Sequence, residues 1–430
     1  MTKVFCAPKD AIPEDRSADV TYFSMYGHDG LPDVSIVGAS LIEDIKRAGV
    51  EPGAASWDFL TLALAVNAAD HAVERSPSAD GWTRVIELEV VLYEPAPFAE
   101  LTDDIEQTLR FLTGDFWHIS FLEGGYPPPI PKHRVVHDAD CVSLLSGGLD
   151  SLVGALDLTA GGRSPIFVSH IAKGDSETQV LYARTLGGGD RHLQWNQNIW
   201  LKPQRDGEGS TRGRSIVFFA FAALAADSHA DATGSNAVDV VVPENGLISL
   251  NVPLNAGRVG SLSTKTTHPV FMRRLQAIWS RLGIPASLQL PYAAVTKAEM
   301  MERCLDRPRL SELAGQSTSC GRYAVYGLQH CGRCVPCLVR RSAFLCSGIA
   351  DTTPKAYHFT DLKAAQPERG ANDVAAVAAA VMKVEESGVR AFTAGQFAAF
   401  ASPIERVAFE GVVERGLAEL GRLLRYHQVL

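Results

Sequence analysis

The sequence predicts an α/β fold built on a doubly wound parallel sheet, preceded by an α+β domain and followed by a helical region. Strand-like and helix-like segments alternate between residues 138 and 350, a pattern in which helices connect successive parallel strands. A glycine-rich turn joins the first of these strands to its helix, and the chain after residue 350 is alanine-rich without strand signals. These observations divide the chain into domains 1–137, 138–350 and 351–430.

Composition narrows the class of protein. The chain has 430 residues, of which 46% are hydrophobic and 21% are charged, as in soluble globular proteins and unlike disordered chains, collagens or coiled coils. The longest apolar run, Ser215–Ala226, is shorter than the ~20 residues of a membrane-spanning helix. The N-terminal segment carries acidic side chains and lacks the apolar core of a secretion signal. We therefore expect a cytoplasmic protein.

Charge is divided unevenly along the chain. The net charge is −9, which argues against general coating of nucleic acid. Residues 1–137 hold 10 basic and 22 acidic side chains, a balance of −12, whereas residues 200–350 hold 17 basic and 10 acidic, a balance of +7. Two interpretations stay open: an acidic solubilising domain beside a neutral one, or a basic middle region that handles an anion such as a nucleotide.

The first domain carries three clear element signals. We predict a helix over Trp57–Val73, an alternating strand over Thr83–Tyr93, and a helix over Thr102–Leu112 with acidic residues in its first turn. A proline-rich stretch, Tyr126–Pro131, closes the block. Because such a stretch is stiff and extended, it suits a domain linker.

The second domain alternates strands and helices. The predicted strands are Cys141–Leu145, Pro165–His170, Val238–Val242 and Leu288–Pro291. The predicted helices are Leu149–Thr159, Gln179–Thr185, Ser215–Ala226 and Lys297–Cys304.

The sharpest local signal is the turn Ser146–Ser151, with the sequence SGGLDS, directly after the first of these strands and directly before a helix. Backbone N–H groups of such a turn and of the helix N-terminus form an anion cradle. Its two glycines let the backbone approach phosphate, and its two serines add donors. The chain has neither the usual NTPase loop nor a dinucleotide-binding glycine pattern. An ordinary glycine-rich turn is the alternative.

The hexapeptide resembles the pyrophosphate loop of the PP-loop ATPases, enzymes of the adenine nucleotide α hydrolase-like fold that cleave ATP between its α and β phosphates. The resemblance implies that ATP is held, with magnesium, by Ser146, Gly147, Gly148, Leu149, Asp150 and Ser151. The transferred group is then AMP, so that an acid or amide oxygen becomes adenylated.

Four of the eight cysteines lie within 18 residues: Cys320, Cys331, Cys334 and Cys337. In a chain without a secretion signal, such a cluster indicates metal ligands rather than disulfides. Four thiolates on tight turns suit a tetrahedral structural zinc site. An iron–sulfur cluster and four unrelated buried cysteines are the alternatives.

The cysteine segment gives the resemblance its specificity. Ser317–Cys320 and His330–Phe344 look like the C-terminal signature of 7-cyano-7-deazaguanine synthase, the QueC family, and Thr296–Met300 matches a third signature in the same order. The resemblance covers residues 138–350. It implies that ATP activates the carboxylate of 7-carboxy-7-deazaguanine as an acyl-adenylate, from which an amine displaces AMP. In the synthase the amine is ammonia, and a second activation yields the nitrile.

Three basic residues are candidates to neutralise phosphate charge. Lys297 matches the family's lysine and is expected at the α-phosphate, and the resemblance implies catalytic roles for Lys297, Asp150 and Arg214. Arg212 and Arg214 precede an apolar helix where the synthase has an Arg-Asn pair, whereas this chain has Ser215 at the Asn position. A solvated basic turn, and a surface helix position for Lys297, are the alternatives.

The residues that would bind the deazaguanine ring are less determined. The segment Ser261–Met272 replaces the family's usual sequence before the substrate-recognition helix. His268 and Phe271 are candidates for hydrogen bonding and stacking, or else for packing. Glu244 and Asn245 follow the third strand, at the sheet edge where ligands of such folds bind; a plain turn is the alternative.

The N-terminal block is absent from the housekeeping synthase. Through Asp80–Arg84 and Phe111–Trp117, it resembles the QueC-like proteins of bacterial anti-phage systems, the QatC component of the Qat system before a CBASS-associated relative. The resemblance implies a changed acceptor, such as an amine of a QatB-like partner protein that docks on the acidic block. A nitrile-forming synthase of the queuosine route and a catalytically weak ATP-binding scaffold are the competing functions. No membrane partner and no direct nucleic-acid binding are expected.

Overall fold

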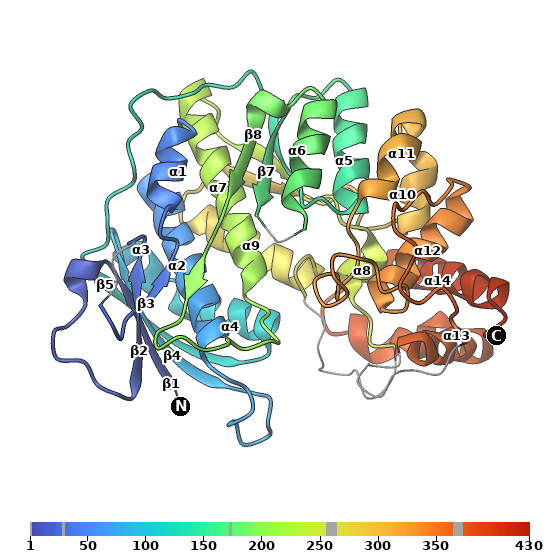
Figure 1. Ribbon diagram of the computed structural model, residues 1–430, viewed down its shortest axis with the longest axis horizontal. Helices are drawn as coiled ribbons and strands as arrows, with labels where there is room; N and C mark the ends of the chain where they lie inside the picture. The colour runs from blue at the N-terminus through green and yellow to red at the C-terminus, as the bar shows by residue number, and fades with distance from the viewer. Residues whose placement is uncertain (1, 28–30, 172–173, 255–264, 364–372) are drawn as a thin grey trace.

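A computed structural model of the chain describes residues 2–27, 31–171, 174–254, 265–363 and 373–430. Two mostly parallel sheets are separated by helices (Figure 1). The first sheet has the order β5-β4-β1-β2-β3-β9, and only its β3–β9 pair is antiparallel. Its strands are β1 (Thr2–Ala7), β2 (Val20–Met25), β3 (Ser35–Val37), β4 (Val85–Leu92), β5 (Phe116–Glu123) and β9 (Ile199–Trp200).

The second sheet is entirely parallel, with the order β11-β10-β6-β7-β8. The chain moves from β6 outward through β7 to β8 and then returns to β10 on the other side of β6. Strand order therefore reverses at β6, and ligands of such sheets bind in the crevice beyond the carboxyl ends of the strands at that point. The strands are β6 (Cys141–Leu144), β7 (Pro165–His170), β8 (His192–Trp195), β10 (Val238–Val241) and β11 (Ala286–Gln289).

Two long helices lie between the sheets: α2 (Ala54–Ala72) packs on the first sheet and α7 (Arg214–Thr233) on the second, and the two helices contact each other. One continuous hydrophobic core contains residues of both sheets and both helices. Strand β9 pairs with β3 although it lies in the region predicted for the second domain. The predicted domains 1–137 and 138–350 are thus joined by a shared core.

The remaining helices form three groups around the two sheets. One group completes the shared core around α7: α1 (Leu41–Arg47), α3 (Ala96–Ala99), α4 (Thr102–Thr113) and α9 (Pro269–Arg281). A second group covers the opposite face of the second sheet: α5 (Leu149–Ala160), α6 (Ser176–Thr185), α10 (Lys297–Arg303) and α11 (Arg307–Leu313). The third group packs beside the second as a C-terminal layer: α8 (Gly246–Leu250), α12 (Val335–Ser347), α13 (Asp373–Phe397) and α14 (Pro403–Tyr426).

Helix α7 has the length and apolar composition of a membrane span, and no other described helix does. It continues to Thr233, beyond the apolar run Ser215–Ala226 on which the sequence prediction rested. Within its most apolar window, 72% of the residues are buried inside the protein, as expected for a core helix between two sheets.

The predicted α/β class, the parallel second sheet and the helical C-terminal region are confirmed. The first sheet differs from the prediction, since its strands β1 to β5 are parallel rather than arranged as in an α+β domain. Four of these strands were missed: β1, β2 and β3 lack a clear alternating pattern, whereas β5 has eight residues and starts with alternating burial, so its length does not explain the miss.

Candidate functional site

The glycine-rich loop lies at the carboxyl end of β6, where strand order reverses. Gly147 has a φ of +84°, a left-handed conformation that favours glycine. The Gly148 N–H donates to Ser146 Oγ at 3.2 Å, and the Ser151 hydroxyl donates to the Gly148 carbonyl at 2.8 Å. A Cβ atom on Gly148 would lie 3.3 Å from the Thr318 carbonyl. The loop is therefore braced internally and closely covered from outside.

Asp150, in the first turn of α5, is held by the first residues of two other helices. Lys297, the first residue of α10, forms an ion pair with Asp150 Oδ1. Asn245, the N-cap of α8, donates its side-chain amide to Asp150 Oδ2 at 2.6 Å and its backbone N–H to the same oxygen at 3.2 Å. The side chains of Asp150 and Lys297 are each only 8% exposed. Two predicted catalytic residues thus meet at one point.

Glu244 makes this cluster asymmetric in charge. Burial and the neighbouring Asp150 carboxylate raise the pKa of Glu244 well above its usual value. Burial also acts to raise the pKa of Asp150, but the charge of Lys297 and a hydrogen bond from Glu244 outweigh it and leave that pKa lowered. One carboxylate and one carboxylic acid therefore lie side by side, with the carboxylate paired to the lysine.

Two residues that the sequence analysis missed hold the loop from outside. Gln179, on α6, donates to the carbonyl oxygens of Ser146 and His170, both at 3.1 Å. The Thr318 N–H donates to the Gly147 carbonyl at 3.0 Å. Thr318 lies inside the segment that resembles the QueC signature, so a signal for it existed. Gln179 carries no sequence signal.

Arg214 lies near the loop, at the N-terminus of α7, and is exposed. Burial, together with the positive charge of Arg214, lowers the pKa of the half-buried His170 to about 4. Burial raises the pKa of the half-buried Asp175, and the charge of Arg214 opposes that rise. One carboxylate oxygen of Asp175 is buried without a hydrogen-bond partner. Asp175 adjoins the loop, because a Cβ atom on Gly147 would lie 3.4 Å from its carbonyl oxygen.

A cavity of about 700 Å³ lies next to segments that contact the loop, and none of the loop residues 146–151 lines it. Its wall combines the residues after β7, the start of α6 and the turns next to the cysteine cluster, including Gly174, Glu177, Ser317, Tyr323 and His330. Ser317 and Gly174 directly precede Thr318 and Asp175, the residues that touch the loop. The volume falls in the range of small-molecule sites.

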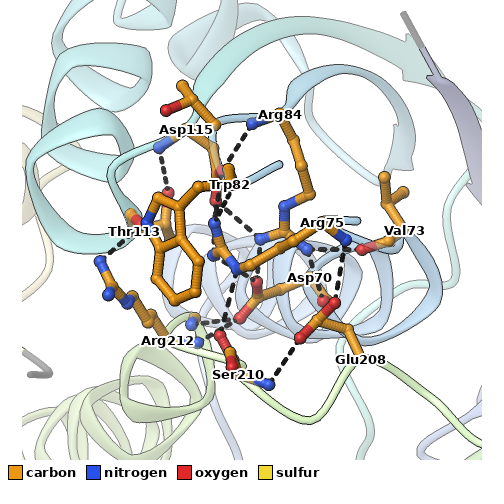
Figure 2. Close-up of polar contacts among 12 residues, drawn as sticks. Asp70, Val73, Arg75, Trp82, Arg84, Thr113, Asp115, Glu208, Ser210 and Arg212 are labelled. Atoms are coloured by element: carbon orange, nitrogen blue, oxygen red, sulfur yellow. Dashed lines mark hydrogen bonds and ion pairs between the residues drawn. The ribbon is translucent and has the colours of Figure 1, made fainter. Parts of the chain in front are cut away.

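A buried ionic network holds the first sheet to the segment before α7 (Figure 2). Asp115 accepts from Arg75 at 2.9 Å and from Arg84 at 2.7 Å, while Asp70 forms an ion pair with Arg84. All four side chains are at most 3% exposed. Breaking such a buried pair by removing one partner costs about 3–5 kcal/mol.

The predicted ATP-binding residue Arg212 belongs to this network. Its guanidinium stacks on Trp82, with 4.9 Å between the carbon of the guanidinium and the ring centre, and donates to the Thr113 carbonyl at 3.3 Å (Figure 2). Asp70 accepts the backbone N–H groups of Arg212 and Gly213 at 2.5 and 2.6 Å. The structure thus brings Arg214 near the loop and directs Arg212 toward the first sheet.

The four cysteines converge as predicted. Their sulfur atoms lie within 4.8 Å of one another, with 3.9 Å for Cys320–Cys334 and for Cys331–Cys337. Sulfurs arranged tetrahedrally around one zinc ion at 2.3 Å are about 3.8 Å apart. The cluster could therefore bind a metal such as zinc.

Backbone N–H groups stabilise negative charge in this cluster. Cys320 Sγ accepts from the N–H of Cys331 at 3.3 Å, and Cys331 Sγ accepts from the N–H of Cys334 at 3.3 Å. Hydrogen bonds from the other thiols, Cys320 first, lower the pKa of Cys331. Thiolates are the form that binds metal.

The two ring-binding candidates are used for packing. Phe271 is fully buried in the shared core. His268 caps α9 by accepting the Val270 N–H at 3.2 Å and lies between the rings of Phe111 and Phe400. Burial lowers the pKa of His268 to about 4. Of the segment predicted to contact the ring, residues 261–264 lie outside the described residues.

No family model and no curated protein matches this chain.

Proposed function

We propose that this chain is an ATP-dependent, AMP-forming carbon–nitrogen ligase of the QueC-like PP-loop type. In this proposal it adenylates the carboxylate of 7-carboxy-7-deazaguanine, or of a related acid, and passes the acyl group to an amine. The observation that carries the proposal is the cluster of Asp150, Lys297 and Asn245 at the first turn of α5. It lies directly behind a glycine-rich loop at the reversal of strand order, where such sheets bind ligands.

The chemistry has two steps. A carboxylate oxygen attacks the α-phosphorus of ATP, the bond from that phosphorus to the bridging oxygen breaks, and pyrophosphate leaves. The amine nitrogen then attacks the acyl carbon, AMP leaves with the bonding electrons, and the amine proton passes to water. A carboxylate is a poor electrophile, so adenylation supplies the leaving group. The loop N–H groups, Lys297 and Arg214 would stabilise the charge that develops on the phosphates.

Magnesium fits the carboxyl oxygens of Asp150 and Glu244, because this hard cation prefers oxygen ligands. When bound there, it would supply further neutralisation of phosphate charge. Asp150 is already ionised through its pair with Lys297, whereas Glu244 keeps its proton beside Asp150. A cation would favour ionisation of Glu244 by the same electrostatic rule.

The cavity next to the segments that contact the loop supports a substrate larger than ammonia. Its volume of about 700 Å³ suits a nucleotide or a nucleobase with part of an acceptor. Together with the acidic charge of residues 1–137, this leads us to propose a role in anti-phage defence similar to that of QatC, with a QatB-like partner protein as amine donor. The cysteine cluster would bind zinc structurally, since protein fills all four positions.

The test uses purified protein with ATP, magnesium and 7-carboxy-7-deazaguanine, followed by mass spectrometry of AMP and of the acyl product. AMP that forms only with the partner protein, together with a mass gain on that partner, is the expected result. AMP with a free nitrile in the presence of ammonium would instead establish a nitrile-forming synthase. Absence of AMP under both conditions would overturn the proposal.

A matched pair of variants connects the result to the site. Asp150→Asn should abolish AMP formation, because it removes the carboxylate that orders Lys297 and Asn245. Asp190→Asn, at an exposed carboxylate, should leave the rate unchanged. Equal rates in the two variants would separate AMP formation from this cluster.

A further inference from the structure

Helix α14 reaches the two helices whose first residues hold Asp150. It packs against α8, which begins after Asn245, and against the α10 region that begins with Lys297. Figure 1 shows α14 (red) on the same side of the molecule as α8 and α10. The C-terminal region, for which the sequence indicated only helices, therefore adjoins the candidate site.

The contact with α10 is polar and buried. Thr296, the N-cap of α10, donates its hydroxyl to Glu419 Oε1 at 2.5 Å and accepts the Glu299 N–H at 3.2 Å. Thr296 is fully buried, and Glu419 is 5% exposed. Arg415, one turn earlier on α14, pairs with Glu299 at 2.7 Å and donates to the Ala294 carbonyl at 2.9 Å. Thr296 and Glu299 form the capping box at the start of α10, and both are thus bonded to α14.

Helix α14 also packs closely against α8, and a glycine on each helix lies at the contact. A Cβ atom on Gly416 of α14 would lie 2.6 Å from a methyl carbon of Leu247. On the other side, a Cβ atom on Gly246 would lie 2.3 Å from the Ala293 carbonyl and 3.1 Å from Val412 of α14. Side-chain atoms at either glycine would push α8 away, so glycine permits the close packing. Asn245 immediately precedes this contact.

We propose that α14 is a positioning element of the candidate site, with Glu419 as its central positioning residue. Glu419 orients Thr296, and Thr296 fixes the first turn of α10, from which Lys297 reaches Asp150. The packing of Gly416 on Leu247 holds the start of α8, from which Asn245 reaches the same carboxylate. In this proposal, residues 403–426 help to position Lys297 and Asn245 at the candidate site. The consequence for rate rests on the proposed function, whereas the consequence for local order does not.

Hydrogen exchange measured by mass spectrometry tests the local order in the full-length protein. Glu419→Ala should speed exchange in the segment 296–303 by about tenfold, since it removes the acceptor that orients a helix cap. Glu419→Gln keeps an acceptor oxygen and should exchange nearly as the unmodified protein does. Glu414→Ala, at an exposed glutamate of the same helix, is the control. Unchanged exchange in Glu419→Ala, or equal acceleration in Glu414→Ala, would overturn the proposal.

A second pair of variants changes Thr296, the donor of the hydrogen bond to Glu419. Thr296→Val should resemble Glu419→Ala, and Thr296→Ser should resemble the unmodified protein, because serine retains the hydroxyl. If Glu419→Ala does not fold, this pair and Glu419→Gln still decide the question. Acceleration in Thr296→Ser as large as in Thr296→Val would contradict the hydrogen-bond argument.

Kinetics of AMP formation distinguish this proposal from the proposed function. Displacing Lys297 should lower kcat in Glu419→Ala by about tenfold while KM for ATP changes less than about twofold. An unmodified protein that forms no AMP would overturn the proposed function, and the exchange data would still decide the role of α14. Normal kcat in a Glu419→Ala protein with accelerated exchange would overturn the positioning role.

Discussion

The N–H of Thr318 donates a hydrogen bond to the carbonyl oxygen of Gly147, with 3.0 Å between nitrogen and oxygen. Thr318 lies two residues before Cys320, so this bond joins the four-cysteine cluster directly to the glycine-rich loop. Within the cysteine segment, the Ser319 N–H donates to the ring of His330, the residue before Cys331, at 3.2 Å. A metal at the cysteines would therefore fix the wall that covers the loop.

This relationship predicts that Cys334→Ser loses its metal and loosens the loop. We expect zinc content, measured by elemental mass spectrometry, to fall from about one equivalent to a small fraction, because one of four ligands becomes a poor zinc donor. Exchange of the N–H groups in residues 317–320 should rise at the same time. Cys346→Ser, at a half-buried cysteine outside the cluster, is the control. Full zinc content in Cys334→Ser would contradict the assignment.

Asp150 and Glu244 both lie beside Lys297, so we expect the stability losses on substituting these two carboxyl groups to be non-additive. In Asp150→Asn, Glu244 loses its negative neighbour and can ionise to pair with Lys297. In Glu244→Gln, the Asp150–Lys297 pair stays. The double variant leaves a buried lysine with neither carboxylate, which costs about 3–5 kcal/mol. Denaturant unfolding should therefore show a loss in the double variant that exceeds the sum of the two single losses. Simple additivity would mean that Glu244 does not substitute for Asp150.

Glu419 predicts a specific dependence of stability on pH. Burial, reinforced by the nearby Glu299 and opposed by Thr296, Arg422 and Arg415, raises the pKa of Glu419 to about 7 from 4.5. The folded protein thus binds this proton more tightly than the unfolded chain does. Stability from this group is fully present below about pH 4.5 and is lost as pH rises through about 7, by up to about 3 kcal/mol.

Glu419→Gln removes that titration. The difference in unfolding free energy between this variant and the unmodified protein should therefore shift in favour of the variant between pH 5 and pH 8. Denaturant titrations at several pH values measure it, with Glu414→Gln as the matched control. A difference that stays constant across this range would show that Glu419 does not keep its proton in the folded protein.

The sequence predicted the helices and strands whose hydrophobic pattern extends over many residues or whose ends are marked by turn or capping residues. Helices α2, α4, α5 and α7 and strands β4, β6, β7 and β10 lie where they were predicted, with ends that differ by a few residues. Of the strands that were missed, β3, β8 and β9 have four residues or fewer, whereas β5 has eight. Pairing of β9 with β3 depends on tertiary contact across more than 150 residues, which no local pattern encodes.

The residues of the candidate site also fall into two groups: those that a local motif marks, and those that only tertiary contacts bring together. The loop, Asp150, Lys297 and the four cysteines stand in recognisable local motifs, and Glu244 and Asn245 follow from their place at the end of a strand. Glu419 and Thr296 are more than 100 residues apart, and their bond exists only because α14 folds back onto α10. The role of Arg212 was ambiguous for a similar reason: its partners are far away in the sequence, Asp70 on α2 and Trp82 in the loop before β4.

Asp70 joins the first sheet to the start of α7 and predicts a large loss of stability. It pairs with Arg84 and accepts the N–H groups of Arg212 and Gly213. Asp70→Ala leaves a buried guanidinium with one fewer partner and two N–H groups unsatisfied. We expect unfolding free energy to fall by about 3–5 kcal/mol, because water cannot replace these bonds in a fully buried network.

The ion pair of Arg134 with the exposed Asp231 is the control for this prediction. Asp231 is 73% exposed, and such surface pairs contribute at most about 1 kcal/mol. Urea titrations of both variants measure this, and Asp231→Ala should change the unfolding free energy little. Because Gly213 directly precedes Arg214, Asp70→Ala should also speed hydrogen exchange in residues 212–218, near the glycine-rich loop. Equal stability losses in the two variants would mean that the network does not fasten the first sheet to α7.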